Sequence, residues 1–247
     1  MRTALLVPVL MVTVACAVQA QDDKKPPRTE FSGDVGFVDV SGNTRVSTLN
    51  VGERYIRRFS HWQFTQDLGV VYGKTEGEES SNLLRSSARG DYNISDNWAT
   101  YALAAFDRNR FAGIRSRFSE GVGLVARLIA TDINQLNIES GFQLTQQQNI
   151  DLTDESFKSL RAAANWKHVF AQNASFFQAL EFLPNLDDSK DMRINSETAI
   201  IAPLSSHVGL KFSYVVRYDN LPSMNAEGTA PLAKTDRIFS SGVQITF

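Results

Sequence analysis

The sequence predicts an all-β protein, a single antiparallel transmembrane β-barrel of about 12 strands in up-and-down meander order. Segments of about ten residues alternate apolar and polar side chains, and turn signals separate them. No stretch after the N-terminal region shows helical periodicity. In residues 237–247 the alternation places Phe239, Val243, Ile245 and Phe247 in one row. Such a row faces an apolar surface while the other row faces water.

The N-terminal residues predict export. Met1–Thr3 carries a positive charge, residues 4–18 are almost wholly apolar, and Val18–Ala20 offers small side chains before a cleavage point. We therefore expect a signal peptide at 1–20, a disordered periplasmic lead at 21–28 and the barrel at 29–247. No later apolar run approaches the roughly 20 residues that a membrane helix needs.

Six segments are expected in the first half, at 31–37, 45–57, 62–72, 84–94, 98–107 and 117–128. Each is expected to be a strand because its apolar residues recur at a spacing of two. Their apolar residues are Phe31, Val35 and Phe37; Leu49, Val51 and Tyr55; Trp62, Phe64, Leu68, Val70 and Tyr72; Leu84, Ala88, Tyr92 and Ile94; Tyr101 and Leu103; Phe118, Val122, Leu124 and Leu128.

Six more segments follow, at 135–144, 160–170, 175–182, 193–202, 208–219 and 234–247. The segment at 208–219 alternates most regularly. Apolar residues of the first five are Leu136, Ile138, Phe142 and Leu144; Leu160, Ala162, Ala164, Trp166 and Phe170; Phe176, Leu180 and Phe182; Ile194, Ile200 and Ala202; Val208, Leu210, Phe212, Tyr214, Val216 and Tyr218.

Connections and aromatic positions favour a membrane barrel over a soluble β-sandwich. Short turns near residues 60, 96, 132, 172 and 205 alternate with connections that are mostly longer, including polar segments at 74–82, 108–115 and 146–156. Aromatic side chains lie near strand ends, as interfacial girdles would, whereas a sandwich concentrates them mid-strand: Trp62, Tyr72, Tyr92, Trp98, Trp166, Phe170, Tyr218 and Phe247.

Composition argues against several functions. The chain has 25 Lys+Arg against 27 Asp+Glu, so no basic excess suggests nucleic acid. The single cysteine, Cys16, lies in the predicted signal peptide, so the mature chain has no thiol chemistry. His61 and His207 fall in predicted short turns and His168 at a strand end, so we expect no metal site, no cofactor and no enzyme. A Ser–His hydrolase of the outer-membrane phospholipase type is the alternative function.

Charged side chains occupy the row expected to face the lumen. The candidate lumen-lining residues are Arg85, Arg89, Arg117, Arg127, Glu139, Arg161, Lys167, Glu181, Arg193, Glu197, Lys211 and Arg217, with Asp91 and Asp219 beside them. They indicate either a somewhat cationic channel for small anionic solutes or a ladder of ion pairs that fills a narrow lumen. Near the outer rim Arg108, Arg110, Arg115 and Arg117 are either solvated loop charges or contacts for lipopolysaccharide phosphates.

Two resemblances indicate where in the cell this protein is located. An amphipathic strand ending in Phe resembles the terminal strand of bacterial outer-membrane barrels, in which the last Phe, here Phe247, belongs to the assembly signal. Residues 107–114, 121–124, 183–186, 195–198, 203–204, 213–219 and 234–236 resemble the salt-induced outer-membrane protein family (YdiY-like), a domain-of-unknown-function family. This resemblance spans about 31–247 and implies an integral Gram-negative outer-membrane barrel. Its implied partners are outer-membrane lipids, lipopolysaccharide and the barrel assembly machinery, and its implied role is a narrow porin-like channel or a structural barrel linked to salt or osmotic stress.

Overall fold

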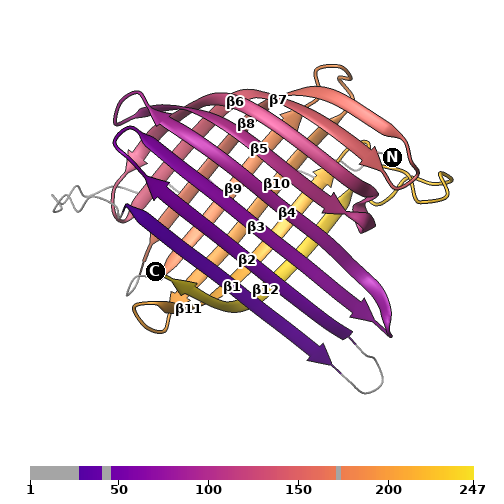
Figure 1. Cartoon of the computed structure of the whole chain (residues 1–247), viewed down its shortest axis with the longest axis horizontal. Coiled ribbons are helices and arrows are strands. Elements are labelled where there is room, and N and C mark those ends of the chain that lie inside the picture. Colours follow the sequence, from indigo (N-terminus) through magenta and orange to yellow (C-terminus); the bar gives the residue numbers. More distant parts are fainter. Residues whose placement is uncertain (1–27, 41–45, 171–173) are drawn as a thin grey trace, which may run out of the picture.

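Twelve antiparallel strands follow one another around a single closed barrel, with β1 (Thr29–Val40) pairing with β12 (Thr235–Thr246) (Figure 1). This confirms the predicted fold class and meander order. The computed structural model describes residues 28–40, 46–170 and 174–247. The predicted signal peptide, nearly all of the predicted lead and the turns around 42 and 172 lie outside the described residues.

The other strands are β2 (Val46–Arg58), β3 (Trp62–Thr75), β4 (Glu78–Asn93), β5 (Trp98–Asn109), β6 (Ile114–Ala130), β7 (Asn134–Asn149), β8 (Asp154–Val169), β9 (Ser175–Pro184), β10 (Met192–Pro203) and β11 (Val208–Asp219). A 3-10 turn, η1 (Arg110–Ala112), joins β5 to β6. No helix in the described ranges is both long and apolar enough to cross a membrane.

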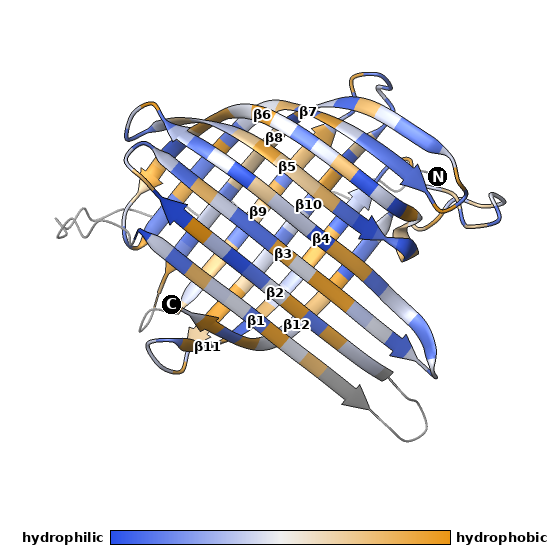
Figure 2. Ribbon diagram, viewed as in Figure 1, coloured by the Kyte–Doolittle hydropathy of each residue, from blue (hydrophilic) through white to orange (hydrophobic). Residues whose placement is uncertain are grey.

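Strand register gathers the apolar rows on the outer surface of the barrel. Ile200 of β10 lies opposite Phe212 of β11, and Tyr214 lies opposite Phe239 of β12; Phe212, Tyr214 and Phe239 are all exposed. The buried side chains include Glu139 and Arg161, which project to the inside. Figure 2 shows the resulting alternation of hydrophobic and hydrophilic bands along the strands. The molecule is therefore apolar outside and polar inside, the reverse of a soluble domain.

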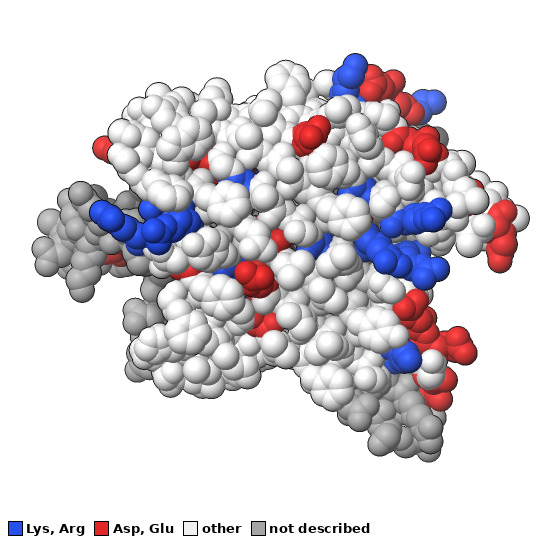
Figure 3. All heavy atoms as spheres, viewed as in Figure 1, with Lys and Arg blue, Asp and Glu red and all other residues white. Residues whose placement is uncertain are grey.

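The outer wall is nearly free of charge between its two ends in the face that Figure 3 shows. Register places four exceptions on the outward row in the described strands: Glu53 of β2, opposite Gly33; Glu120 of β6 and Lys158 of β8, both opposite Leu144; and Arg237 of β12, opposite Val216. Sequence patterns had not singled out these residues.

Strands extend further than predicted at the end of the barrel that carries the longer connections. The polar segments 74–82 and 146–156 were expected to be loops, and this was wrong. β3 runs to Thr75 and β4 begins at Glu78, while β7 runs to Asn149 and β8 begins at Asp154. These strand ends are polar on both faces because both faces meet water there, so they lack the alternation that identifies a strand.

The seam between β1 and β12 is short. Its register joins Ser32–Val35 to Val243–Thr246, while β1 and β2 pair along the whole of Thr29–Val40. Phe31 and Phe247 add two reciprocal backbone hydrogen bonds, with N···O distances of 3.0 and 2.9 Å. The C-terminal residue therefore takes part in closing the barrel.

Candidate functional site

The candidate lumen-lining residues lie on the inward row of the wall. Gly141 of β7 pairs with Arg161 of β8, Ala163 with Glu181 of β9, and Asn195 of β10 with both Glu181 and Arg217 of β11. The same alternation includes Arg85, Arg89, Arg117, Arg127, Glu139, Lys167, Arg193, Glu197 and Lys211. They do not form one cluster, because some join a buried network while others form separate pairs.

Glu139 is the centre of the buried network. Arg89 Nη1 donates to both Glu139 oxygens at 3.0 and 2.8 Å, and Arg161 Nη1 donates to Oε2 at 2.5 Å. Arg161 Nε donates to Glu181 at 2.6 Å, and Arg89 also binds Asp91 at 2.8 Å. Because β5 and β6 separate β4 from β7, the Arg89–Glu139 pair reaches across two intervening strands. The network therefore thickens this part of the wall.

Tyr101 lies beneath these arginines. The Arg89 guanidinium carbon is 4.2 Å from the Tyr101 ring centroid, and Arg161 Nη1 donates to Tyr101 Oη at 3.0 Å. On β6 and β7, a Cβ at Gly123 or Gly141 would lie 2.8 Å from Tyr101 Cε1 or 2.7 Å from its Oη. The two glycines thus make room for the ring, which is buried. Sequence reasoning missed this role because Tyr101 was grouped with apolar residues.

Separate ion pairs line the opposite part of the interior. Arg54 of β2 binds Asp67 of β3 at 2.6 Å, and Lys211 of β11 binds Asp34 of β1 at 2.9 Å. Gly69 of β3 also lies on the inward row, and a Cβ there would meet nothing within 4 Å. There is accordingly open space beside Gly69 and the Arg54–Asp67 pair.

We call the inner surface of β5–β9, with Arg89 and Asp91 of β4, the packed arc. The inner surface of β11, β12 and β1–β3 is the open arc. Side chains of Arg161 and Glu139 are 9% and 5% exposed, whereas those of Arg54 and Asp67 are 52% and 36% exposed. Since the strands form a closed ring, water reaches the Arg54–Asp67 pair from within the barrel.

The β11–β12 connection, residues 220–234, crosses part of one mouth (Figure 1). Ser223 Oγ donates to Asn149 Oδ1 at 2.8 Å and accepts from Gln147 Nε2 at 3.2 Å. Both partners belong to β7, which is no neighbour of β11 or β12 in the sheet. This connection narrows the mouth.

Register also shows that the sequence-derived list undercounted inner carboxylates. Asp34, Asp67, Asp107 and Asp236 lie on the inward row, opposite Gly52, Arg54, Arg85 and Arg217. Of the basic side chains away from the strand ends, only Arg54 was overlooked in the part of the barrel that the structure describes. The basic surplus expected from the sequence is therefore almost cancelled.

The histidines form simple local contacts. His61 Nδ1 lies 3.0 Å from Ser60 Oγ, His207 Nδ1 lies 2.8 Å from Ser206 Oγ, and His168 Nδ1 lies 2.8 Å from Asn134 Oδ1. None of the three imidazoles contacts a carboxylate in the described ranges, and His168, whose ring contacts an amide oxygen, has no serine hydroxyl among its hydrogen-bond partners there. Within the same ranges no three His, Cys, Asp or Glu side chains converge as a metal site requires.

Fold and inner wall together define a twelve-stranded barrel with an apolar exterior and a charged, hydrogen-bonded interior. Residues 33–247 match the family described as "Protein of unknown function, DUF481", and the chain belongs to that family. Over 208 residues it is 23% identical to "Uncharacterized protein YdiY" of Escherichia coli (strain K12), covering 83% of this chain and 81% of that protein. The family resemblance inferred from sequence is thereby confirmed.

Solved barrels resemble this one only in general form. The NanC porin gives a TM-score of 0.49 at 11% identity, covering 87% of this chain and 97% of that one. The KdgM porin gives 0.46 at 10% identity, covering 89% and 99%. The translocator domain of the autotransporter NalP from Neisseria meningitidis gives 0.46 at 11% identity, covering 91% and 90%. No conclusion about solutes follows from likenesses this distant.

Proposed function

We propose that this protein is an integral outer-membrane barrel of a Gram-negative bacterium that forms a narrow, water-filled channel along its open arc. In a closed ring each strand can form backbone hydrogen bonds with a neighbour on both sides, and lipid requires this because it offers no hydrogen-bond partners. The outward rows present apolar side chains to lipid. The N-terminal sequence supports export.

The observation that best supports a channel is the water-accessible inner surface around Arg54, Asp67 and Gly69. An ion pair that is 52% and 36% exposed inside a closed ring indicates room for water beside the packed arc. The side chains of the packed arc fill the interior beside β5–β9, so the path is narrow and suits small solutes.

Charge along this path is close to balanced, since Asp34, Asp67 and Asp236 accompany Lys211, Arg54 and Arg217. We therefore infer a weak preference between small anions and cations rather than the clear anion preference that the sequence suggested. Any preference fades as salt screens the wall.

Planar-bilayer recording of the refolded protein tests the channel. The wild type should give steady conductance, and Gly69→Trp should lower it because the indole enters the open arc. Gly90→Trp is the matched control: Gly90 also has nothing within 4 Å of a Cβ, but it lies on the outward row of β4 opposite Phe64.

Absence of conductance in the wild type would contradict the channel. It would favour the second candidate, a structural barrel stiffened by the packed arc, for which the buried Glu139 network is the specific support. Under either role, the family resemblance suggests expression under salt or osmotic stress, which transcript levels across a salt series would test.

We further propose that Phe247 is read by the barrel assembly machinery. Deletion of Phe247 removes both the side chain and the hydrogen bonds to Phe31, whereas Phe247→Ala keeps those bonds. Assembly should fall in both variants far more than in Phe212→Ala, an exposed outward aromatic residue of β11. Normal assembly of Phe247→Ala would show that seam bonds, not a signal, explain the deletion.

A further inference from the structure

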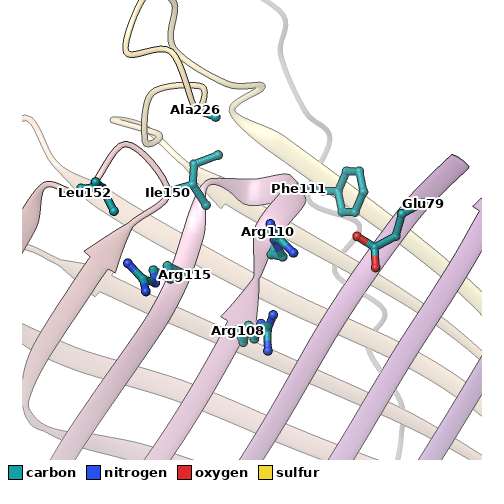
Figure 4. Close-up of a pocket in the computed structure, with 8 residues that line it drawn as sticks. All are labelled: Glu79, Arg108, Arg110, Phe111, Arg115, Ile150, Leu152 and Ala226. Carbon is teal, nitrogen blue, oxygen red and sulfur yellow. The ribbon is translucent and has the colours of Figure 1, made fainter.

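A pocket of about 570 Å³ lies at the rim of the barrel, at the β5–β6 connection. Three arginines line it: Arg108 at the end of β5, Arg110 in η1 and Arg115 at the start of β6. Figure 4 shows them around this connection, with Phe111 and Glu79 on one side and Ile150, Leu152 and Ala226 on the other. In Figure 3 the same end of the wall carries a group of basic side chains.

A local backbone irregularity holds one of the arginines outside the strand ladder. The β6–β7 register shifts between Ile114 and Ser116, which makes Arg115 an extra residue of β6, and the β5–β6 register shifts at the same part of β6. Such bulges re-aim side chains at barrel rims. By alternation with Phe106, Arg108 belongs to the outward row, opposite Leu84. Arg117, which the sequence grouped with these three, points inward and donates to Gln147 at 2.5 Å.

The turn itself is fixed on two sides. Gly113 has a φ of 75°, and a Cβ there would lie 2.7 Å from Ser223 and 2.8 Å from Leu232 of the β11–β12 connection. Ile150 N donates to Gly113 O at 2.9 Å. The pocket therefore has a preformed wall built from three separate connections.

Charge and polarity identify the occupant. No ion pair involves the Arg108, Arg110 or Arg115 guanidiniums within the described chain, and Glu79, the one carboxylate of the pocket, accepts from Asn82. Directly below Arg108 on the outward row, Phe106 lies opposite Phe118, and both are exposed. A phosphate group with acyl chains beneath it matches this order of charge over apolar surface.

We propose that Arg108, Arg110 and Arg115 bind the phosphate groups of lipopolysaccharide, the anionic glycolipid of the outer leaflet, while its acyl chains lie on the Phe106–Phe118 surface. This site rests on the outer-membrane location proposed above. Guanidinium groups suit it because they bind phosphate oxygens in a bidentate manner.

Binding of fluorescent lipopolysaccharide to the purified full-length barrel in detergent tests the site. The triple variant Arg108→Gln, Arg110→Gln, Arg115→Gln should weaken affinity by about tenfold or more, since three charge-assisted contacts are lost. Arg237→Gln, an exposed outward arginine of β12 away from the pocket, is the matched control and should bind as the wild type does. A heat-dependent shift in gel mobility checks folding; if the triple variant fails it, Arg110→Gln alone should still weaken binding.

Two further arms separate the sources of phosphate. Dephosphorylated glycolipid should bind the wild type as weakly as intact glycolipid binds the triple variant, and inorganic phosphate should not displace the intact probe. Equal affinity of triple variant and wild type, equal loss in Arg237→Gln, or displacement by inorganic phosphate would each overturn the proposal. Because binding is measured in detergent, failure of the location would appear separately, as fractionation of the protein away from the outer membrane.

Discussion

The packed and open arcs contain the same ion-pair chemistry in different surroundings. Arg161 Nε lies 2.6 Å from Glu181, and Arg54 Nε lies 2.6 Å from Asp67. Arg161 is almost fully buried and has Glu139 and Tyr101 as further partners, whereas Arg54 is half exposed and has Asp67 alone among the hydrogen bonds of the described side chains. The two pairs therefore differ in their contribution to stability because of desolvation and shared partners, not because of distance.

The largest loss of stability is expected for Glu139→Gln in the packed arc. The substitution removes the one negative charge shared by Arg89 and Arg161, both largely buried. Loss of one member of a buried pair costs about 3–5 kcal/mol. Urea unfolding in detergent should show a decrease of that order, and an unchanged midpoint would mean that the network adds nothing to stability.

Alanine substitutions at two inward glycines, one in each arc, should change the stability of the barrel in opposite directions. Gly141→Ala places a Cβ 2.7 Å from Tyr101 Oη and 2.3 Å from Val122 O, so overpacking should destabilise the barrel by about 1–3 kcal/mol. In Gly69→Ala the new Cβ meets nothing within 4 Å. Alanine lowers the backbone entropy of the unfolded chain, so this substitution should stabilise the barrel by about 0.5–1 kcal/mol. Thermal shifts measured by circular dichroism would distinguish them, and destabilisation by Gly69→Ala would show that the open arc is filled.

The smallest effect is expected for Asp67→Asn in the open arc. Arg54 keeps contact with water when its partner becomes neutral, so we expect a loss of about 1 kcal/mol or less. High salt should reduce even this difference. A loss as large as that of Glu139→Gln would show that the two arcs do not differ.

The sequence predicted those parts of the molecule in which one side of each strand meets lipid and the other meets water. There the spacing of two places residues such as Phe212 and Arg217 on opposite faces. It failed where both sides meet water, at the outer ends of β3, β4, β7 and β8. The same alternation puts Asp34 and Asp67 in the polar rows, but they were not among the predicted lumen-lining residues. Only the three-dimensional pairing shows that each has a basic partner inside the barrel, Lys211 and Arg54.

Pairing across the interior could not be predicted. Arg89 and Glu139 lie 50 residues apart and on strands that are not adjacent, so neither local pattern nor strand order connects them. The rim pocket illustrates the same limit, since the bulge at Arg115 and the outward position of Arg108 separate these residues from the inward Arg117 in a way that charge spacing alone does not show.

The short β1–β12 seam has a consequence for ring closure. Bringing together the ends of a chain of this length costs about 5 kcal/mol of chain entropy. A backbone hydrogen bond contributes about 1 kcal/mol net in water, so the few bonds between Ser32–Val35 and Val243–Thr246, with those of Phe31 and Phe247, roughly balance that cost. In hydrocarbon an unmade bond costs several kcal/mol, so the balance moves firmly toward closure. The surrounding bilayer thus supplies the additional free energy that favours closure of the β1–β12 seam.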